Sequence, residues 1–277
     1  MTFRMKAVAA AILAIASVSG NASITTFGTP TTGGEGVLNI VDVGNQRSYT
    51  RDLGVLFRDF TPTSATITAP GYSFSWAADS QLTTFLSAAV SSNVFYSVIF
   101  GRADAQTISV TTNLAAVPAT ADRQNRQSVR NAVGAMDQYI GGANTLGTHG
   151  SSANGSNTAV PSDGVAYVDQ AGNSARLSDQ IFGALTRPGH GILGTLGSSM
   201  NVLNLSGLGG TATAAATYDF YDNTAGLSTF TLGLDGTLTF ASPQTSNPAV
   251  IPVPGALVLM ASGLVAFGTI ARRRNSR

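Results

Sequence analysis

The chain contains no cysteine, only two histidines and a single glutamate in its 277 residues. Without cysteine it has no disulfide framework, no thiolate metal site and no cysteine nucleophile. Two histidines also exclude most histidine-rich zinc sites. Charged residues make up only 10% of the chain, whereas a soluble domain usually has about a quarter. This scarcity argues against a nucleic-acid-binding protein and against a charged disordered chain.

The basic residues are concentrated at the two ends of the chain. Arg4 and Lys6 lie near the start, and four arginines lie within the last six residues. Between them are nine arginines and all fourteen acidic residues, which gives a net charge of −5 and no lysine. A body with this charge repels nucleic acid and anionic lipid at long range. We therefore expect no nucleic-acid partner.

The first 22 residues have the three parts of a secretory signal peptide. Arg4 and Lys6 precede an apolar run at residues 7–18, and Gly20 and Ala22 provide small residues before a cleavage site between Ala22 and Ser23. The run is too short to span a hydrocarbon core of about 30 Å. The alternative is a buried N-terminal helix. The pattern predicts export through the secretion translocon and removal of residues 1–22 by signal peptidase.

Residues 246–277 have a second tripartite pattern. A polar linker leads to Pro252-Val253-Pro254, followed by an apolar or small-residue stretch at 256–271 and then by Arg272, Arg273 and Arg274. Sixteen helical residues reach about 24 Å, and snorkelling arginines extend that length. Basic residues directly after an apolar helix hold that end in the cytoplasm. This predicts a transmembrane helix with the body outside the inner membrane and Arg272, Arg273 and Arg274 as the membrane stop.

This tail resembles the PEP-CTERM sorting signal of Gram-negative bacteria. Pro252, Val253 and Pro254 occupy the motif positions, with Val253 where the family usually has glutamate. The resemblance implies recognition by an exosortase, a membrane-embedded cysteine protease or transpeptidase that removes the tail. It also implies delivery to the cell surface or to a biofilm matrix containing extracellular polysaccharide, with the inner membrane occupied only transiently. The alternative is a plain C-terminal membrane anchor.

The body at residues 23–245 is predicted to be mainly β, a β-sandwich-like exported domain with a few helical insertions. Short alternating runs rich in Val, Thr, Ser and Phe recur through it, and Asp235-Gly236 between two such runs predicts a hairpin. The body is long enough to bury a core without cross-links. We predict strands at residues 37–41, 55–60, 65–68, 72–76, 94–100, 107–111, 165–168, 200–205, 217–221, 228–232 and 237–240.

Three segments show helical periodicity. Helices are predicted at residues 80–91, 122–140 and 177–185, the second with Asp122 as its N-cap. Residues 141–162 are rich in Gly, Asn, Ser and Thr, which predicts a flexible loop. One face of the second helix carries Arg123, Arg126 and Arg130. These arginines either form a solvated surface or bind an anionic glycan or phosphate.

Few residues offer a catalytic or metal-binding pattern. Residues 189–194 match GxGxxG but do not follow a strand, which favours a glycine-rich loop. His149 and His190 lie among small polar residues and glycines. Three aspartates lie at strand ends: Asp219, Asp222 and Asp235. They either stabilise turns or form a catalytic carboxylate pair or a calcium site. We predict no cofactor, no metal and no catalytic residue.

Aromatic residues give a different kind of candidate. One strand face carries Tyr72, Phe74 and Trp76. These rings either pack in the core or stack on a sugar. Tyr221 breaks the alternation of Tyr218 and Phe220, so we expect Tyr221 to be exposed. Tyr221 and Trp76 are therefore the candidate glycan contacts.

These patterns support three hypotheses. The first is a non-enzymatic exported protein of the cell surface or matrix, with a structural or adhesive role. The second is a carbohydrate-binding module for matrix polysaccharide. The third is a secreted hydrolase that uses the two histidines or a pair of aspartates.

Overall fold

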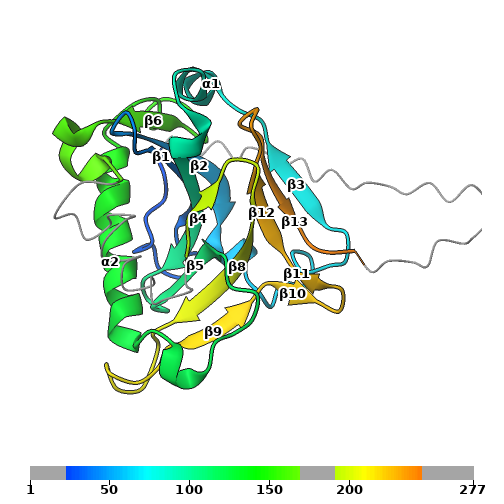
Figure 1. Cartoon of the computed structure of the whole chain (residues 1–277). Helices are drawn as coiled ribbons and strands as arrows, with labels where there is room; N and C mark the ends of the chain where they lie inside the picture. Colours follow the sequence, from blue (N-terminus) through cyan, green and yellow to red (C-terminus); the bar gives the residue numbers. More distant parts are fainter. Residues whose placement is uncertain (1–22, 169–190, 245–277) are drawn as a thin grey trace, which may run out of the picture. The chain divides into compact units, whose positions relative to one another are not determined.

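The computed structural model describes residues 23–168 and 191–244 (Figure 1). They lie in one compact unit that ends at Gln244. Several predictions concern residues outside this description: the predicted helix at 177–185, His190, Ala22, Pro252, Val253, Pro254, Arg272, Arg273 and Arg274. In the part that is described, no helix is long and apolar enough to cross a membrane.

Eleven antiparallel strands form one sheet that curls strongly (Figure 1). Its order is β3-β13-β12-β8-β5-β4-β1-β2-β6, with β7 paired to β4 and β9 to β8. The strands are β1 Glu35–Asp42, β2 Arg47–Leu56, β3 Ser73–Trp76, β4 Val94–Arg102, β5 Thr107–Thr112, β6 Ser156–Ala159, β7 Gly194–Thr195, β8 Ser199–Ser206, β9 Thr217–Phe220, β12 Thr229–Leu232 and β13 Leu238–Ala241. A separate ribbon pairs β10 Asp222–Asn223 with β11 Gly226–Leu227.

The prediction of a mainly β fold is confirmed. A sandwich has two sheets packed face to face, whereas here one continuous sheet curls around a core. The predicted hairpin at Asp235-Gly236 joins β12 to β13, and Gly236 has the positive φ of +80° that this turn requires.

Two α-helices accompany the sheet, α1 Ser80–Ser87 and α2 Arg126–Ala143. The N-cap of α2 is Asn125, whose side chain accepts a hydrogen bond from the Ser128 amide at 2.8 Å. The prediction of Asp122 as the cap is wrong, because Asp122 lies in a 3-10 turn at Thr120–Asp122. Other 3-10 turns lie at Phe57–Asp59, Ser91–Asn93 and Pro161–Ala166.

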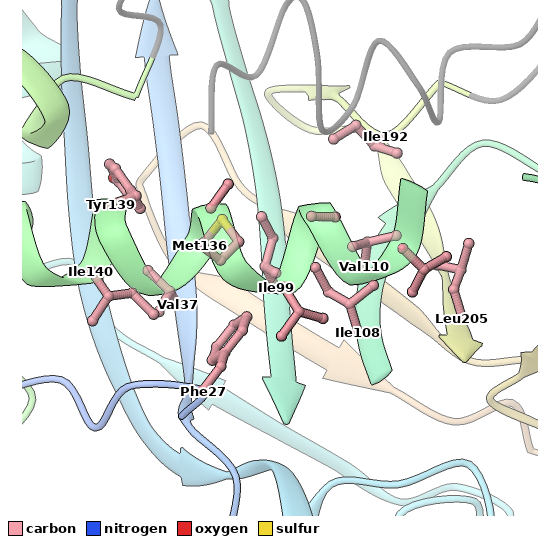
Figure 2. Close-up of a cluster of buried hydrophobic side chains, with 14 of the residues drawn as sticks. Phe27, Val37, Ile99, Ile108, Val110, Met136, Tyr139, Ile140, Ile192 and Leu205 are labelled. Atoms are coloured by element: carbon pink, nitrogen blue, oxygen red, sulfur yellow. The ribbon is translucent and has the colours of Figure 1, made fainter. Parts of the chain in front are cut away.

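Each face of the sheet has its own hydrophobic core, because side chains alternate along every strand. On one face α2 packs over the sheet, and Figure 2 shows Met136 and Ile140 above Val37, Ile99 and Ile108. The other face lines the inside of the curl with Leu38, Val98, Phe100, Met200 and other apolar residues.

Phe60 lies at the centre of the inner core. Its ring stacks on Phe100 and Tyr221, with centroids 4.2 and 4.8 Å away. Phe240 meets the Phe60 ring edge-on at 5.1 Å, and Phe230 lies at 5.7 Å. Phe60 follows the turn at Phe57–Asp59, so one residue outside the strands brings together rings from opposite parts of the sheet.

Three side-chain hydrogen bonds link β2 to β3 and the segment after it, across the opening of the curled sheet. Trp76 Nε1 donates to the Leu53 carbonyl at 2.9 Å, and the Tyr49 hydroxyl donates to Asp79 Oδ2 at 2.8 Å. The third is donated by Arg51 Nη1 to the Ala77 carbonyl. The inner core is thus enclosed although β2 and β3 do not pair.

Three strand predictions are wrong. Of the strand predicted at 55–60, only Val55 and Leu56 belong to β2, and Phe57–Asp59 form a 3-10 turn. Residues 65–68 form turns instead of a strand, and the 3-10 turn Pro161–Ala166 occupies the start of the strand predicted at 165–168. The segment predicted as a flexible loop, 141–162, forms turns over 144–154, but it also contains the end of α2 and strand β6, which pairs with β2. Some of its polar side chains bond to each other. His149 Nε2 lies 3.0 Å from Asn157 Oδ1, and both residues are fully buried.

Candidate functional site

The expectation that Tyr221 is exposed is wrong. Its ring is 0% exposed, and its hydroxyl lies 2.9 Å from Ser109 Oγ and donates to the Phe60 carbonyl at 2.8 Å. Burial raises the pKa of the Tyr221 phenol. Strand β9 ends at Phe220, and the residue after it points into the inner core while Tyr218 and Phe220 pack in the other core. Tyr221 is therefore inaccessible and is not a glycan contact.

Trp76 packs in the core, as one of the two sequence interpretations predicts. It is 9% exposed, its Nε1 is bonded to the Leu53 carbonyl, and its ring centroid is 4.4 Å from that of Phe74. Tyr72 and Phe74 are half-buried against the same core. The aromatic side chains of β3 thus stabilise the fold and do not form an exposed strip.

In the described residues His149 is not brought together with the candidate aspartates, although Asp222 is near enough to affect the pKa of Asp219. His149 is fully buried, and burial lowers the pKa of its imidazole. Asp235 accepts hydrogen bonds from the Thr237 amide and hydroxyl, and these stabilise the turn between β12 and β13. Burial, with a smaller contribution from the charge of Asp222, raises the pKa of Asp219. Within residues 23–168 and 191–244 no three His, Asp or Glu side chains are grouped to hold a metal ion.

The arginines of α2 bind backbone carbonyls of one glycine-rich loop. Arg130 donates from Nε and Nη2 to the Gly207 carbonyl at 3.1 and 2.9 Å, and from Nη2 to Gly209 at 3.2 Å. Arg126 donates to the carbonyls of Leu208 and Ala215. Arg123 lies 5.6 Å from the ring centre of Tyr218. Arg126 and Arg130 thus hold the loop after β8 against the helix. Arg123 precedes α2 and donates from Nε to the Pro118 carbonyl, so the prediction that the three arginines share one helix face is wrong.

Arg130→Ala is expected to loosen that loop and to lower the free energy of unfolding by about 1–2 kcal/mol, since it removes hydrogen bonds from a charged donor. Hydrogen–deuterium exchange at residues 207–211 should accelerate. The control is Arg58→Ala, because the Arg58 side chain is 54% exposed and pairs with Asp59 on the surface. Equal exchange in the two variants would contradict the assigned role.

A groove between α1 and the edge strand β6 is the candidate site that the structure adds. It encloses about 560 Å³, within the ~300–1,000 Å³ range of small-ligand sites. Ser80, Gln81 and Thr84 of α1 form one wall. Phe85 of α1 also lines the groove, and the remaining lining comes from the ends of β2 and β6 and from residues beyond β6: Arg47, Thr158, Ala159, Val160 and Asp163. Figure 1 shows α1 and β6 at the same end of the curled sheet.

Hydrogen bonds at the start of α1 fix the wall of the groove. Asp79 is the N-cap, and its Oδ1 accepts from the Leu82 amide at 2.7 Å. Its Oδ2 accepts from the Tyr49 hydroxyl on β2 at 2.8 Å. Burial by itself would raise the pKa of Asp79, but hydrogen bonds from Leu82, Ser156 and Tyr49 outweigh burial and lower it. The helix is therefore tied to the sheet by a carboxylate that stays charged.

Arg47 at the end of the groove is equally constrained. Its Nε donates to Asp42 Oδ2 at 3.2 Å, and its Nη2 donates to the Phe85 carbonyl at 2.7 Å. The guanidinium carbon lies 4.5 Å from the centre of the Phe85 ring. Asp42 is fully buried, so the charge of Arg47 is paired inside the protein.

No family model, no curated protein and no solved structure matches this chain. A functional proposal therefore depends on the chain's own residues.

Proposed function

We propose that the chain is an exported protein of the cell surface or extracellular matrix, sorted by an exosortase and acting without catalysis in structure or adhesion. The observation that carries the proposal is the order of elements in the tail. Pro252-Val253-Pro254, the apolar stretch 256–271 and Arg272-Arg273-Arg274 follow one another as in a PEP-CTERM signal. The signal-peptide pattern at residues 1–22 supplies the export step that such sorting requires.

The body has properties that suit an exported scaffold. It has no cysteine, yet its curled sheet is covered by α2 on one face and filled by an aromatic core on the other. A core of this kind supports a fold outside the cytoplasm without cross-links.

The sorting proposal predicts processing at both ends. Protein recovered from the host should begin near Ser23 and lack everything after about Pro254. Intact-mass measurement and sequencing of both termini, on protein from membranes, cell surface and medium, will check this. A membrane-bound form that still carries Arg272–Arg277 would overturn exosortase processing and leave an anchored ectodomain.

A variant pair tests the motif itself. Replacing Pro252 and Pro254 together by alanine should keep the tail on the protein and leave it in the membrane fraction. The matched control is Pro248→Ala, since Pro248 lies in the linker before the motif. The proposal requires the control to be processed like the natural protein; processing of the double variant at the natural rate would count against it.

A further inference from the structure

Free hydrogen-bonding side chains line the groove between α1 and β6. The hydroxyls of Ser80 and Thr158 and the amide of Gln81 make no hydrogen bond within the described chain. Hydroxyls and amides each both donate and accept hydrogen bonds, as the hydroxyls of a sugar do. Ser80 and Thr158 are exposed and Gln81 is half-buried, so a ligand can reach all three.

The groove carries little free charge. Arg47 is already paired with buried Asp42, and Asp163 contributes one carboxylate whose Oδ2 accepts from the Val160 amide at 2.8 Å. Outside the two terminal segments the chain has fourteen acids against nine arginines. An anionic ligand is repelled by this excess, and a cation finds only the single carboxylate of Asp163. The electrostatics therefore favour a neutral ligand.

The edge of β6 does not accept an additional strand. An added strand bonds to every second residue of its neighbour, here the positions of Ser156, Thr158 and Val160. The Ser156 carbonyl and amide are already bonded to Thr148, each at 2.9 Å, and the Val160 amide is bonded to Asp163. Only Thr158 is left to pair, so an extended peptide has no ladder to join.

The apolar part of the lining complements these polar groups. Phe85 and Ala159 form a buried floor, and Val160 is 43% exposed at its side. Such a surface suits the C–H face of a sugar ring, while the surrounding hydroxyl and amide groups meet its hydroxyls. The wall is preorganised by the Asp79 cap and by the three contacts of Arg47, so little side-chain entropy is lost on binding.

We infer that the groove between α1 and β6 binds a short stretch of neutral polysaccharide, with Gln81, Ser80 and Thr158 as the hydrogen-bonding contacts. The inference rests on the proposed surface or matrix role and names the ligand that the body would bind in that role. Its physical basis is independent of the tail, since no residue of the groove belongs to either terminal signal.

Titration calorimetry of the full chain, in detergent if it stays with membranes, against neutral gluco-, manno-, xylo- and galacto-oligosaccharides is the test. We expect saturable binding of at least one of them. Gln81→Ala should weaken it about 2- to 10-fold, the effect of one lost neutral hydrogen bond. Thr158→Trp should fill the groove and weaken binding by more than tenfold.

The matched controls are Gln127→Ala and Thr83→Trp. Gln127 is exposed on α2 and Thr83 is exposed on α1, and neither residue lines the groove. Both should bind as the natural chain does, and all four variants should keep its thermal unfolding temperature. If Thr158→Trp does not fold, the binding of Gln81→Ala and Ser80→Ala decides the test. No binding by any of these sugars, or equal binding by the groove and control variants, would overturn the inference. The sorting proposal would still be decided by the termini, so the two can fail separately.

Discussion

Replacing Phe60 by alanine is expected to lower the free energy of unfolding by about 3–5 kcal/mol, the usual cost of removing a buried phenylalanine. The Phe60 side chain is 0% exposed and touches rings from β4, β12 and β13 and the residue after β9. The cavity therefore opens in the middle of the inner core, where rings from distant strands limit its collapse. Urea denaturation followed by circular dichroism measures the change.

Two controls bracket that result. Phe60→Leu keeps most of the volume and should cost less than Phe60→Ala. Leu234→Ala removes a side chain that is 73% exposed at the tip of the β12–β13 hairpin, so its effect should stay within about 0.5 kcal/mol. If Phe60→Ala behaved like Leu234→Ala, Phe60 would not be the centre of the core.

Several strands could be predicted from the sequence, because alternating residues and short apolar runs leave a local signal. Residues 94–100, 107–111 and 200–205 fall within β4, β5 and β8. The single curled sheet could not be predicted. It depends on β8 lying between β5 and β12, and on contacts such as Trp76 with Leu53 that no local pattern encodes.

Polar composition at residues 141–162 predicted the turns over 144–154 but missed strand β6. Glycine, asparagine and serine usually mark a loop, but here they allow close packing. Gly155 lies against the backbone of His149, where a Cβ would come within 2.8 Å. Asn157 joins a buried polar row across three strands, opposite Thr50, which in turn is opposite Asn39. Tyr139 of α2 bonds to both Asn39 and Thr50, so the row is fixed by tertiary partners.

The candidate groove shows the same limit. Gln81 and Thr158 are far apart in sequence and come together only because β6 pairs with β2 and α1 is tied to β2 through Asp79. Conversely, the residues that the sequence marked as glycan contacts, Trp76 and Tyr221, are buried, because large aromatic side chains are the main material of a core without cross-links.

Asp52 is expected to make the fold less stable as pH rises toward 7. The residue is 1% exposed, and burial raises the pKa of its carboxyl from 3.8 to about 7, with a further contribution from the charge of Glu35. The unfolded chain releases this proton near pH 4, whereas the folded chain holds it until about pH 7. Between those values the folded state binds more protons, so stability falls with rising pH and levels off above pH 7.

Asp52→Asn should remove most of this dependence, because the amide is neutral at every pH and its carbonyl oxygen can still accept from the Gly54 amide, which lies 2.8 Å from Asp52 Oδ1. The variant should exceed the natural chain in stability by up to about 4 kcal/mol at pH 8, since each unit of pKa shift corresponds to about 1.4 kcal/mol. Near pH 4 the gain should be much smaller. Urea denaturation at pH 4, 5, 6, 7 and 8 measures the two curves.

The control for Asp52→Asn is the same chemical change at exposed Asp122. Asp122→Asn should keep the pH profile of the natural chain. A second variant, Glu35→Gln, removes the neighbouring negative charge and should shift the decline to lower pH, because the Asp52 proton then leaves more easily. A stability gain of Asp52→Asn that is the same at pH 4 and pH 8 would show that Asp52 does not titrate in this range. Buried His149 acts in the opposite direction, because burial lowers the pKa of its imidazole and stability is lost as pH falls.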